Sequence, residues 1–250
     1  MKGTVVPGYR VASQKSREYP YGTIDRQKPY FKRMGLDLDR DLCLRNLQRI
    51  LERARAAGTF VRVDMEDTDH TDRTLAMVSE LHREFDNVGT VLQAYLYRTE
   101  KDLMALAAEG IPVRLVKGAY QEPPEKAYPR KADVDANYIR LAQRLLDRAA
   151  VGPAVDGSGR VPPSCAVATH DERIIATARA YATEHGISAD HFEFQMIYGV
   201  RSQLQDRLAS EGYAVRVYVP YGTHWYPYFM RRLAERPANV WFFVSSLFKR

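Results

Sequence analysis

The chain has 250 residues, 45% of them hydrophobic, with 37 Lys and Arg against 31 Asp and Glu. This length and composition predict one soluble α/β domain, and no apolar stretch is long enough to span a bilayer. The two cysteines, Cys43 and Cys165, have no paired spacing, which argues against a disulfide framework, a zinc cluster or an iron–sulfur site and favours a reducing compartment.

The excess of positive charge is confined to the start of the chain. Residues 1–34 contain eight Lys or Arg and two Asp or Glu, whereas the remaining 216 residues balance at 29 against 29. The body therefore gives no electrostatic argument for nucleic-acid binding. We interpret residues 1–34 as an atypical basic segment and residues 35–250 as the folded domain.

From residue 60 onward, short apolar, β-branched runs alternate with helix-like segments. The runs begin near residues 60, 89, 113, 164, 191 and 213, and residues 71–85 and 138–149 carry apolar side chains at helical spacing. This alternation predicts parallel βαβ units, which in a barrel open their active site at the C-terminal strand ends. Two Pro-rich loops, at 122–131 and 151–163, flank the second helix; we expect functional lids, with a disordered insertion as the alternative.

The first run, VRVDMED, places Asp64, Glu66 and Asp67 at the end of a strand. Metal ligation is one interpretation, but His170 in VATHD is the only strong companion, which is too little for a metal centre. A lone histidine of this kind is more often a structural residue or a hydrogen-bond donor to a phosphate or hydroxyl. Gln93, inside the apolar run VLQAY, must find partners for its amide, and the edge of a heteroaromatic ring would supply them.

The run VRLVKGAY is unusual because it carries Arg114 and Lys117 in an apolar context. A buried cation requires an anion or an electron-rich partner, and Gly118 and Ala119 would permit the close approach of a planar group. Two alternatives stay open. Arg114 points outward while Lys117 extends to solvent at the strand end, or Lys117 forms a Schiff base as in an aldolase-like barrel.

The last segment, YPYFMRRLAER, places Arg231 and Arg232 side by side on a helix with Glu235 within reach of both. Two guanidinium groups held in this way could bind a small carboxylate, and a solvated basic face with a helical salt bridge is the alternative. The position of this helix, after a strand that contains Tyr218, favours ligand binding.

Together these strand ends offer an amide, cations, a Thr-His pair, a carboxylate, a tyrosine and an arginine pair. They contain neither a metal-binding set nor a nucleophile with its base. Such a site suits a planar, anionic cofactor and a small carboxylate substrate.

Seven motifs, in unbroken order over residues 35–248, resemble those of the flavin-dependent proline dehydrogenase family, monofunctional bacterial kind. They are VRVDMED, VLQAYLYRTEKDL, VRLVKGAY, VATHD, FEFQMIYGVR, VRVYVPYG and WYPYFMRRLAERPANV. The resemblance implies a (β/α)8 TIM-type barrel, recognisable here for six of eight strands and N-terminally incomplete, that binds FAD. It also implies oxidation of L-proline to 1-pyrroline-5-carboxylate, with electrons passed to a membrane quinone, by a cytoplasmic protein associated peripherally with the inner face of the cell membrane.

The same resemblance assigns roles to residues by matching motif. Arg231 and Arg232 would bind the proline carboxylate and Tyr218 would shape the substrate pocket, while Arg114 would lie near the flavin N5 and Asp64 near the reacting ring. The residues expected to contact FAD are Met65, Gln93, Lys117, Gly118, Ala119, Thr169 and His170. No metal is implied.

The N-terminal segment departs from the family pattern. Family members carry a strand ending in KLTQLG, whose lysine joins the arginine pair on the substrate carboxylate, whereas this chain has YFKRMG. Tyr30 takes the position of that lysine, and Lys32 is displaced by two residues. A truncated or non-catalytic family member is therefore an alternative to an active enzyme.

Overall fold

The computed structural model describes residues 9–15 and 220–221 by their backbone, and residues 40–120, 122–152 and 158–219 in full. The chain divides into two compact units, one of residues 1–12 and 41–218 and the other of residues 13–40 and 219–250. The described elements belong almost entirely to the first unit. Its strands are β2 (Val61–Val63), β3 (Val88–Gln93), β4 (Val113–Val116), β5 (Cys165–Ala168), β6 (Phe192–Ile197) and β7 (Ala214–Tyr221), after β1 (Tyr9–Lys15).

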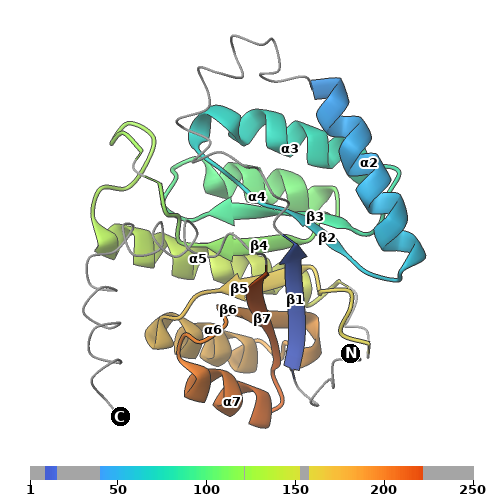
Figure 1. Cartoon of the computed structure of the whole chain (residues 1–250). Helices are drawn as coiled ribbons and strands as arrows, with labels where there is room; N and C mark the ends of the chain where they lie inside the picture. The colour runs from blue at the N-terminus through green and yellow to red at the C-terminus, as the bar shows by residue number, and fades with distance from the viewer. Residues whose placement is uncertain (1–8, 16–39, 121, 153–157, 222–250) are drawn as a thin grey trace, which may run out of the picture. The chain divides into compact units, whose positions relative to one another are not determined.

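Helices alternate with these strands, as the sequence predicts. They are α2 (Arg40–Ala56), α3 (Thr68–His82), α4 (Thr99–Ala108), α5 (Lys131–Ala149), α6 (Glu172–Glu184) and α7 (Ser202–Ser210), with a 3₁₀ turn η1 (Ala189–His191) before β6. Figure 1 shows β2 to β7 side by side in a curved sheet, with the connecting helices along its outer side.

The six strands β2 to β7 follow chain order in the sheet, and each is parallel to the next. This arrangement confirms the prediction of six consecutive βαβ strands of a TIM-type barrel. The sheet also contains β1, which lies next to β7. No strand was expected in residues 1–34, because that segment lacks the alternation of apolar and polar residues seen in the later strands.

The two faces of the sheet differ in chemistry because successive side chains of a strand point to opposite faces. The outer face is apolar and packs against the helices, with Leu115, Val167, Phe194 and Val215 buried in one row across four strands. The opposite, interior face carries polar and charged side chains at alternate positions. The apolar face therefore forms the core, and the interior face is where chemistry can occur.

The helix predicted at residues 138–149 begins earlier, at Lys131, directly after Pro129 and Arg130. Its first two turns alternate charged residues with small or single apolar ones, and Val134 is the only large apolar residue among them, so the helical spacing is weaker there. These polar residues bind neighbouring elements instead: the Asn137 side chain donates to the Ala94 carbonyl at 2.7 Å.

The connection between β4 and α5 is packed against the ends of β2 and β3. The Glu122 carboxylate accepts hydrogen bonds from the backbone N–H and the hydroxyl of Thr68, at 2.8 and 2.6 Å, at the start of α3. Leu96 and Ala127 form an isolated β-bridge. The alternative of a disordered insertion is therefore wrong for residues 122–130, whereas the second loop is only partly within the described residues.

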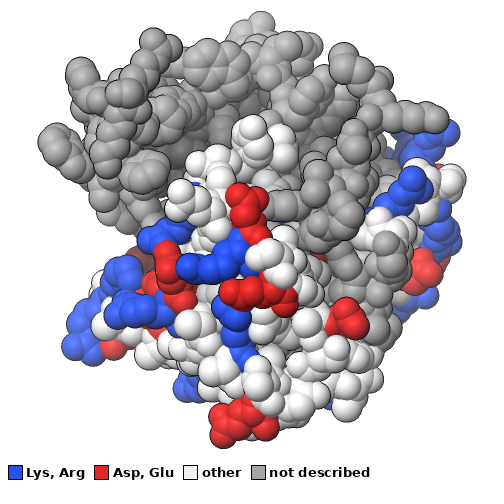
Figure 2. Space-filling view, turned by 90° about the horizontal axis from the view of Figure 1, so that it is seen from below, with Lys and Arg blue, Asp and Glu red and all other residues white. Residues whose placement is uncertain are grey.

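Charge is evenly mixed on the face shown in Figure 2, where basic and acidic side chains of the described residues alternate. Among the helices that the structure describes, none combines the length and the apolar character needed to cross a bilayer.

Gly89 of β3 lies where the backbone just before β4 approaches closely. A Cβ at this position would lie 2.4 Å from the Pro112 carbonyl oxygen and 2.8 Å from the Phe60 ring. We expect Gly89→Ala to lower the free energy of unfolding by about 1 to 3 kcal/mol, because a backbone carbonyl cannot move aside cheaply. Chemical denaturation measures this, with Gly152→Ala as the control, since the nearest atom to a Cβ there is the rotatable Ser164 hydroxyl at 3.2 Å and the nearest backbone carbonyl oxygen is at an ordinary 3.5 Å. Equal losses in the two variants would contradict the prediction.

Candidate active site

The interior face of the sheet gathers six polar residues from strands far apart in the sequence, which we call the interior polar group. Its members are Arg62, Asp64, Arg114, Glu193, Gln195 and Arg216. The strand register explains the grouping, because Arg114 is level with Glu193 across Ala166 of β5, and Gln195 is level with Arg216.

Arg114 lies at the centre of this group. One terminal nitrogen of its guanidinium donates to Asp64 and the other approaches the Gln195 amide oxygen at 3.5 Å. Only 14% of the Arg114 side chain is exposed, so the alternative in which it points outward is wrong. Burial lowers the pKa of Arg114 to about 10, which leaves the guanidinium charged at neutral pH.

Glu193 and Arg216 form a buried ion pair beside Arg114. The Arg216 guanidinium donates two hydrogen bonds to the Glu193 carboxylate, at 2.8 and 3.0 Å, and the Gln195 amide nitrogen donates a third at 2.6 Å. We did not predict these three residues as part of the site. The sequence nevertheless indicates them, because each is a polar or charged residue at every second position of an otherwise apolar strand, as Arg114 is.

Arg62 supplies a third cation on the same face. It donates to the backbone carbonyls of Thr90 and Pro112, at 3.1 and 2.8 Å. Burial, and next the nearby Arg114, lower the pKa of Arg62 to about 9. Three arginines thus share two carboxylates, Asp64 and Glu193, so the interior polar group carries one excess positive charge. A buried cation in excess favours binding of an anion.

Gln93 and Gly118 lie where β3 and β4 end. The Gln93 amide nitrogen donates to the Glu66 carbonyl at 3.2 Å, and its oxygen is buried without a hydrogen-bond partner among the described residues. Gly118 has a φ of +107°, and a Cβ there would lie 2.1 Å from the Tyr95 ring. The glycine is therefore required by Tyr95 packing, a reason that the sequence pattern does not reveal. Of the other predicted contacts in this region, Met65 is buried and Ala119 is exposed.

Lys117 faces away from the interior polar group. Its ammonium donates to Asp135 of α5 at 2.5 Å and to Asp171, the N-cap of α6, at 2.9 Å. Only 17% of the side chain is exposed, so the expectation that Lys117 extends to solvent is wrong. The nitrogen of Lys117 is thus engaged by two carboxylates, whereas a Schiff-base lysine must be free to attack a carbonyl carbon.

Thr169 and His170 follow β5. The Thr169 hydroxyl accepts from the backbone N–H of Asp171 at 3.1 Å. His170 Nε2 accepts the backbone N–H of Ile197 at 2.9 Å, which places the proton of the neutral ring on Nδ1. In the part of the chain that the structure describes, no three His, Cys, Asp or Glu residues converge as metal ligands.

Tyr218 lies on β7 two residues after Arg216, and therefore on the same, interior face of the sheet. Arg231, Arg232 and Glu235 lie outside the described residues, as do Tyr30 and Lys32.

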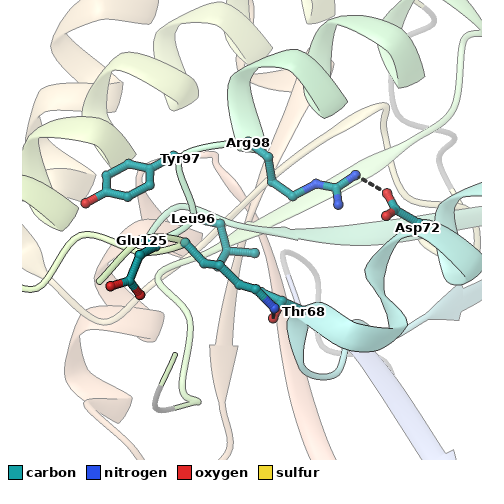
Figure 3. Close-up of a pocket in the computed structure, with 7 residues that line it drawn as sticks. Thr68, Asp72, Leu96, Tyr97, Arg98 and Glu125 are labelled. Atoms are coloured by element: carbon teal, nitrogen blue, oxygen red, sulfur yellow. Dashed lines mark hydrogen bonds and ion pairs between the residues drawn. The ribbon is translucent and has the colours of Figure 1, made fainter. Parts of the chain in front are cut away.

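A pocket of about 320 Å³ lies elsewhere, between the start of α3 and the two loops that follow β3 and β4 (Figure 3). Its lining residues are Thr68, Asp72, Leu96, Tyr97, Arg98, Glu125 and Lys126. The Arg98 guanidinium is held by Asp72 at 2.5 Å and by Asp102 at 2.6 Å. The predicted site residues do not line this pocket. We place the candidate site on the interior face because it holds buried polar atoms of Gln93 and Arg114 that have no hydrogen-bond partner within the described ranges.

Comparison with known proteins gives a consistent result. The sequence model of the family described as proline dehydrogenase matches residues 7–244, so the match begins inside the basic segment 1–34. Proline dehydrogenase 2 of Bacillus subtilis is 45% identical over 217 residues, which are 87% of this chain and 67% of that protein. Proline dehydrogenase of Deinococcus radiodurans is 47% identical over 211 residues, 84% of this chain and 64% of that protein.

A crystal structure of proline utilization A from Bdellovibrio bacteriovorus, inactivated by N-propargylglycine, is similar with a TM-score of 0.66 and 31% identity. The match covers 78% of this chain and 22% of that one. The chain thus spans about two thirds of the curated relatives and about a fifth of the larger protein.

The Lys117 ion pairs generate a pH prediction. Burial, the largest influence, would by itself raise the pKa of Asp135 and Asp171. The hydrogen bonds and the charge of Lys117, acting with Lys131 and, for Asp171, with the backbone N–H of Arg173, together outweigh burial and hold both pKa values below the ordinary value. Depressed carboxylate pKa values stabilise the fold above about pH 4, and this stabilisation is lost as the pH falls through the folded-state values. We expect Lys117→Met to cost about 1.5 to 3 kcal/mol at pH 7 and to flatten the loss of stability below about pH 4.

Denaturation curves from pH 2 to pH 7 test this prediction, with the exposed Lys126, 3.3 Å from Asp69, as the matched control. Lys126→Met should change the free energy of unfolding by less than about 1 kcal/mol. An acid profile of Lys117→Met parallel to that of the unmodified protein would contradict the assignment.

Proposed function

Because the chain belongs to the proline dehydrogenase family, we propose that it oxidises L-proline to 1-pyrroline-5-carboxylate with bound FAD. The reaction removes two electrons and two hydrogens, a hydride from C5 and a proton from the ring nitrogen, and leaves a C=N bond. Bound FAD would supply the acceptor for the hydride, and a membrane quinone would be the final acceptor of the two electrons.

The observation that carries this proposal is the excess positive charge of the interior polar group. Hydride transfer adds negative charge to the acceptor ring, and preorganised cations in a water-poor site stabilise such charge without reorganising. Arg114 is suited to this role, because it is charged and buried and its Nε has no hydrogen-bond partner in the described part of the chain. Asp64 holds the guanidinium from the other side and would lie close to the substrate ring.

The residues at the strand ends fit an isoalloxazine ring. The buried Gln93 oxygen, which has no hydrogen-bond partner among the described residues, is an acceptor for a ring N–H, and we propose that His170 contacts the ring from the end of β5. We propose that Met65, Lys117, Gly118, Ala119 and Thr169 complete the FAD site, with Lys117 and Gly118 acting through the packing of their own loops.

We assign the substrate carboxylate to Arg231 and Arg232, with Tyr218 shaping the pocket. These arginines lie outside the described residues, and their role rests on the family motif alone. A quinone acceptor places the working enzyme at the membrane surface, so we propose a cytoplasmic protein that contacts the inner face of the cell membrane.

A lysine Schiff-base enzyme is a poorer account, because Lys117 is paired with two carboxylates. The two proposals differ in outcome. A proline dehydrogenase releases a product two hydrogens lighter than proline, detectable by mass spectrometry, whereas a Schiff-base enzyme becomes covalently labelled at Lys117 when borohydride is added with a carbonyl substrate. A non-catalytic family member would do neither.

Arg114→Met tests the electrostatic role directly. We expect the rate of flavin reduction by proline to fall by about 10²-fold, the scale for removing one preorganised donor, while FAD content stays close to that of the unmodified protein. Stopped-flow absorbance measures the rate. The matched control is Arg98→Met, which removes a cation paired with Asp72 and Asp102 outside the interior face. Similar rates of flavin reduction in the two variants would show that Arg114 has no specific role in the reaction.

Arg231→Met and Arg232→Met test the carboxylate site. Each change removes a charge-assisted hydrogen bond worth roughly 1.5 to 3 kcal/mol, so proline affinity should fall on the order of 10- to 150-fold. Flavin content should stay unchanged. Unaltered proline kinetics in both variants would contradict this assignment and favour the alternative in which the two arginines belong to a solvated helix face.

A further inference from the structure

We infer that Gln195 is a positioning residue that orients the guanidinium of Arg114. Its own orientation is fixed by the buried ion pair of Glu193 and Arg216. The catalytic consequence of this inference rests on the proposed flavin chemistry, but the hydrogen-bonded arrangement itself does not.

The direction of each hydrogen bond follows from the ion pair. The Glu193 carboxylate is fully buried, and a carboxylate can only accept hydrogen bonds. It receives two bonds from Arg216 and one, at 2.6 Å, from the Gln195 amide nitrogen. Because the nitrogen of this amide must face Glu193, its oxygen must face the other way, where Arg114 Nη1 lies at 3.5 Å.

Gln195 and Asp64 therefore hold Arg114 from two sides. Each accepts from a different terminal nitrogen, so the plane of the guanidinium is defined by the protein before any ligand arrives. The third nitrogen, Nε, stays buried and has no hydrogen-bond partner among the described residues. A buried donor whose position is fixed in advance stabilises most strongly a negative charge that develops during a reaction.

Gln195→Met tests the inference, because methionine has a similar volume and neither donates nor accepts strongly. The measured quantity is the midpoint potential of the bound FAD, without proline. Looser positioning of Arg114 should weaken stabilisation of the reduced flavin about tenfold, which lowers a two-electron potential by about 30 mV. Arg114→Met should lower it further, and adding Gln195→Met to Arg114→Met should change nothing more.

Gln205→Met is the matched control. Gln205 is also buried, but its amide donates to the carbonyls of Ile197 and Val200, at 3.0 and 2.9 Å, away from Arg114. This variant should lose stability and keep its flavin potential. The inference would be overturned if Gln195→Met left the midpoint potential unchanged. It would also be overturned if Gln195→Met shifted the potential equally in the unmodified protein and in the Arg114→Met variant.

A measurement without flavin separates this inference from the proposed function. In the unmodified protein, NMR should show the Gln195 side-chain amide exchanging with water at least tenfold more slowly than exposed glutamine amides. Glu193→Met, which removes the acceptor, should abolish that protection. If the protein binds no FAD, the proposed function fails while this experiment still decides the arrangement. Free exchange of the amide in the unmodified protein would show that Glu193 does not hold it.

Discussion

The burial of Arg114 within a parallel sheet is the constraint on which the rest of the site depends. A guanidinium inside a strand must be paired, and the fold supplies Asp64, directly after β2, and the Gln195 amide from β6. Gln195 in turn requires Glu193, which requires Arg216 on β7. One buried cation thus links β2, β4, β6 and β7, and it brings residues separated by more than a hundred positions into one group.

One face of the sheet forms the hydrophobic core, and the other face carries the candidate site. Strands of parallel sheets are ordinarily apolar on both faces, but here only the face against the helices is apolar. Among the described residues, the interior polar group contains three arginines and two carboxylates, an arrangement that adds little net stability when buried and is better explained by a ligand that brings negative charge. Lys117 contributes to stability, since its ion pairs connect the end of β4 to α5 and to the start of α6.

The βαβ alternation and the placement of Asp64 and Arg114 on the interior face could be predicted from sequence, because periodicity and charged residues in apolar runs are local signals. The direction of Lys117 could not, since it depends on Asp135 and Asp171, eighteen and fifty-four residues away. Glu193, Gln195 and Arg216 gave the same alternating signal as Arg114. They were missed because each completes the site only through the others. The need for Gly118 also depends on a distant contact, with the ring of Tyr95.

The central claim is that the interior face is built to favour an anion. The most direct measurement is the midpoint potential of FAD bound to the unmodified protein, compared with free FAD in the same buffer and without substrate. The account predicts that the bound flavin is easier to reduce and has a more positive potential, because the excess cation stabilises the reduced, negatively charged form. A potential equal to or more negative than that of free FAD would contradict it.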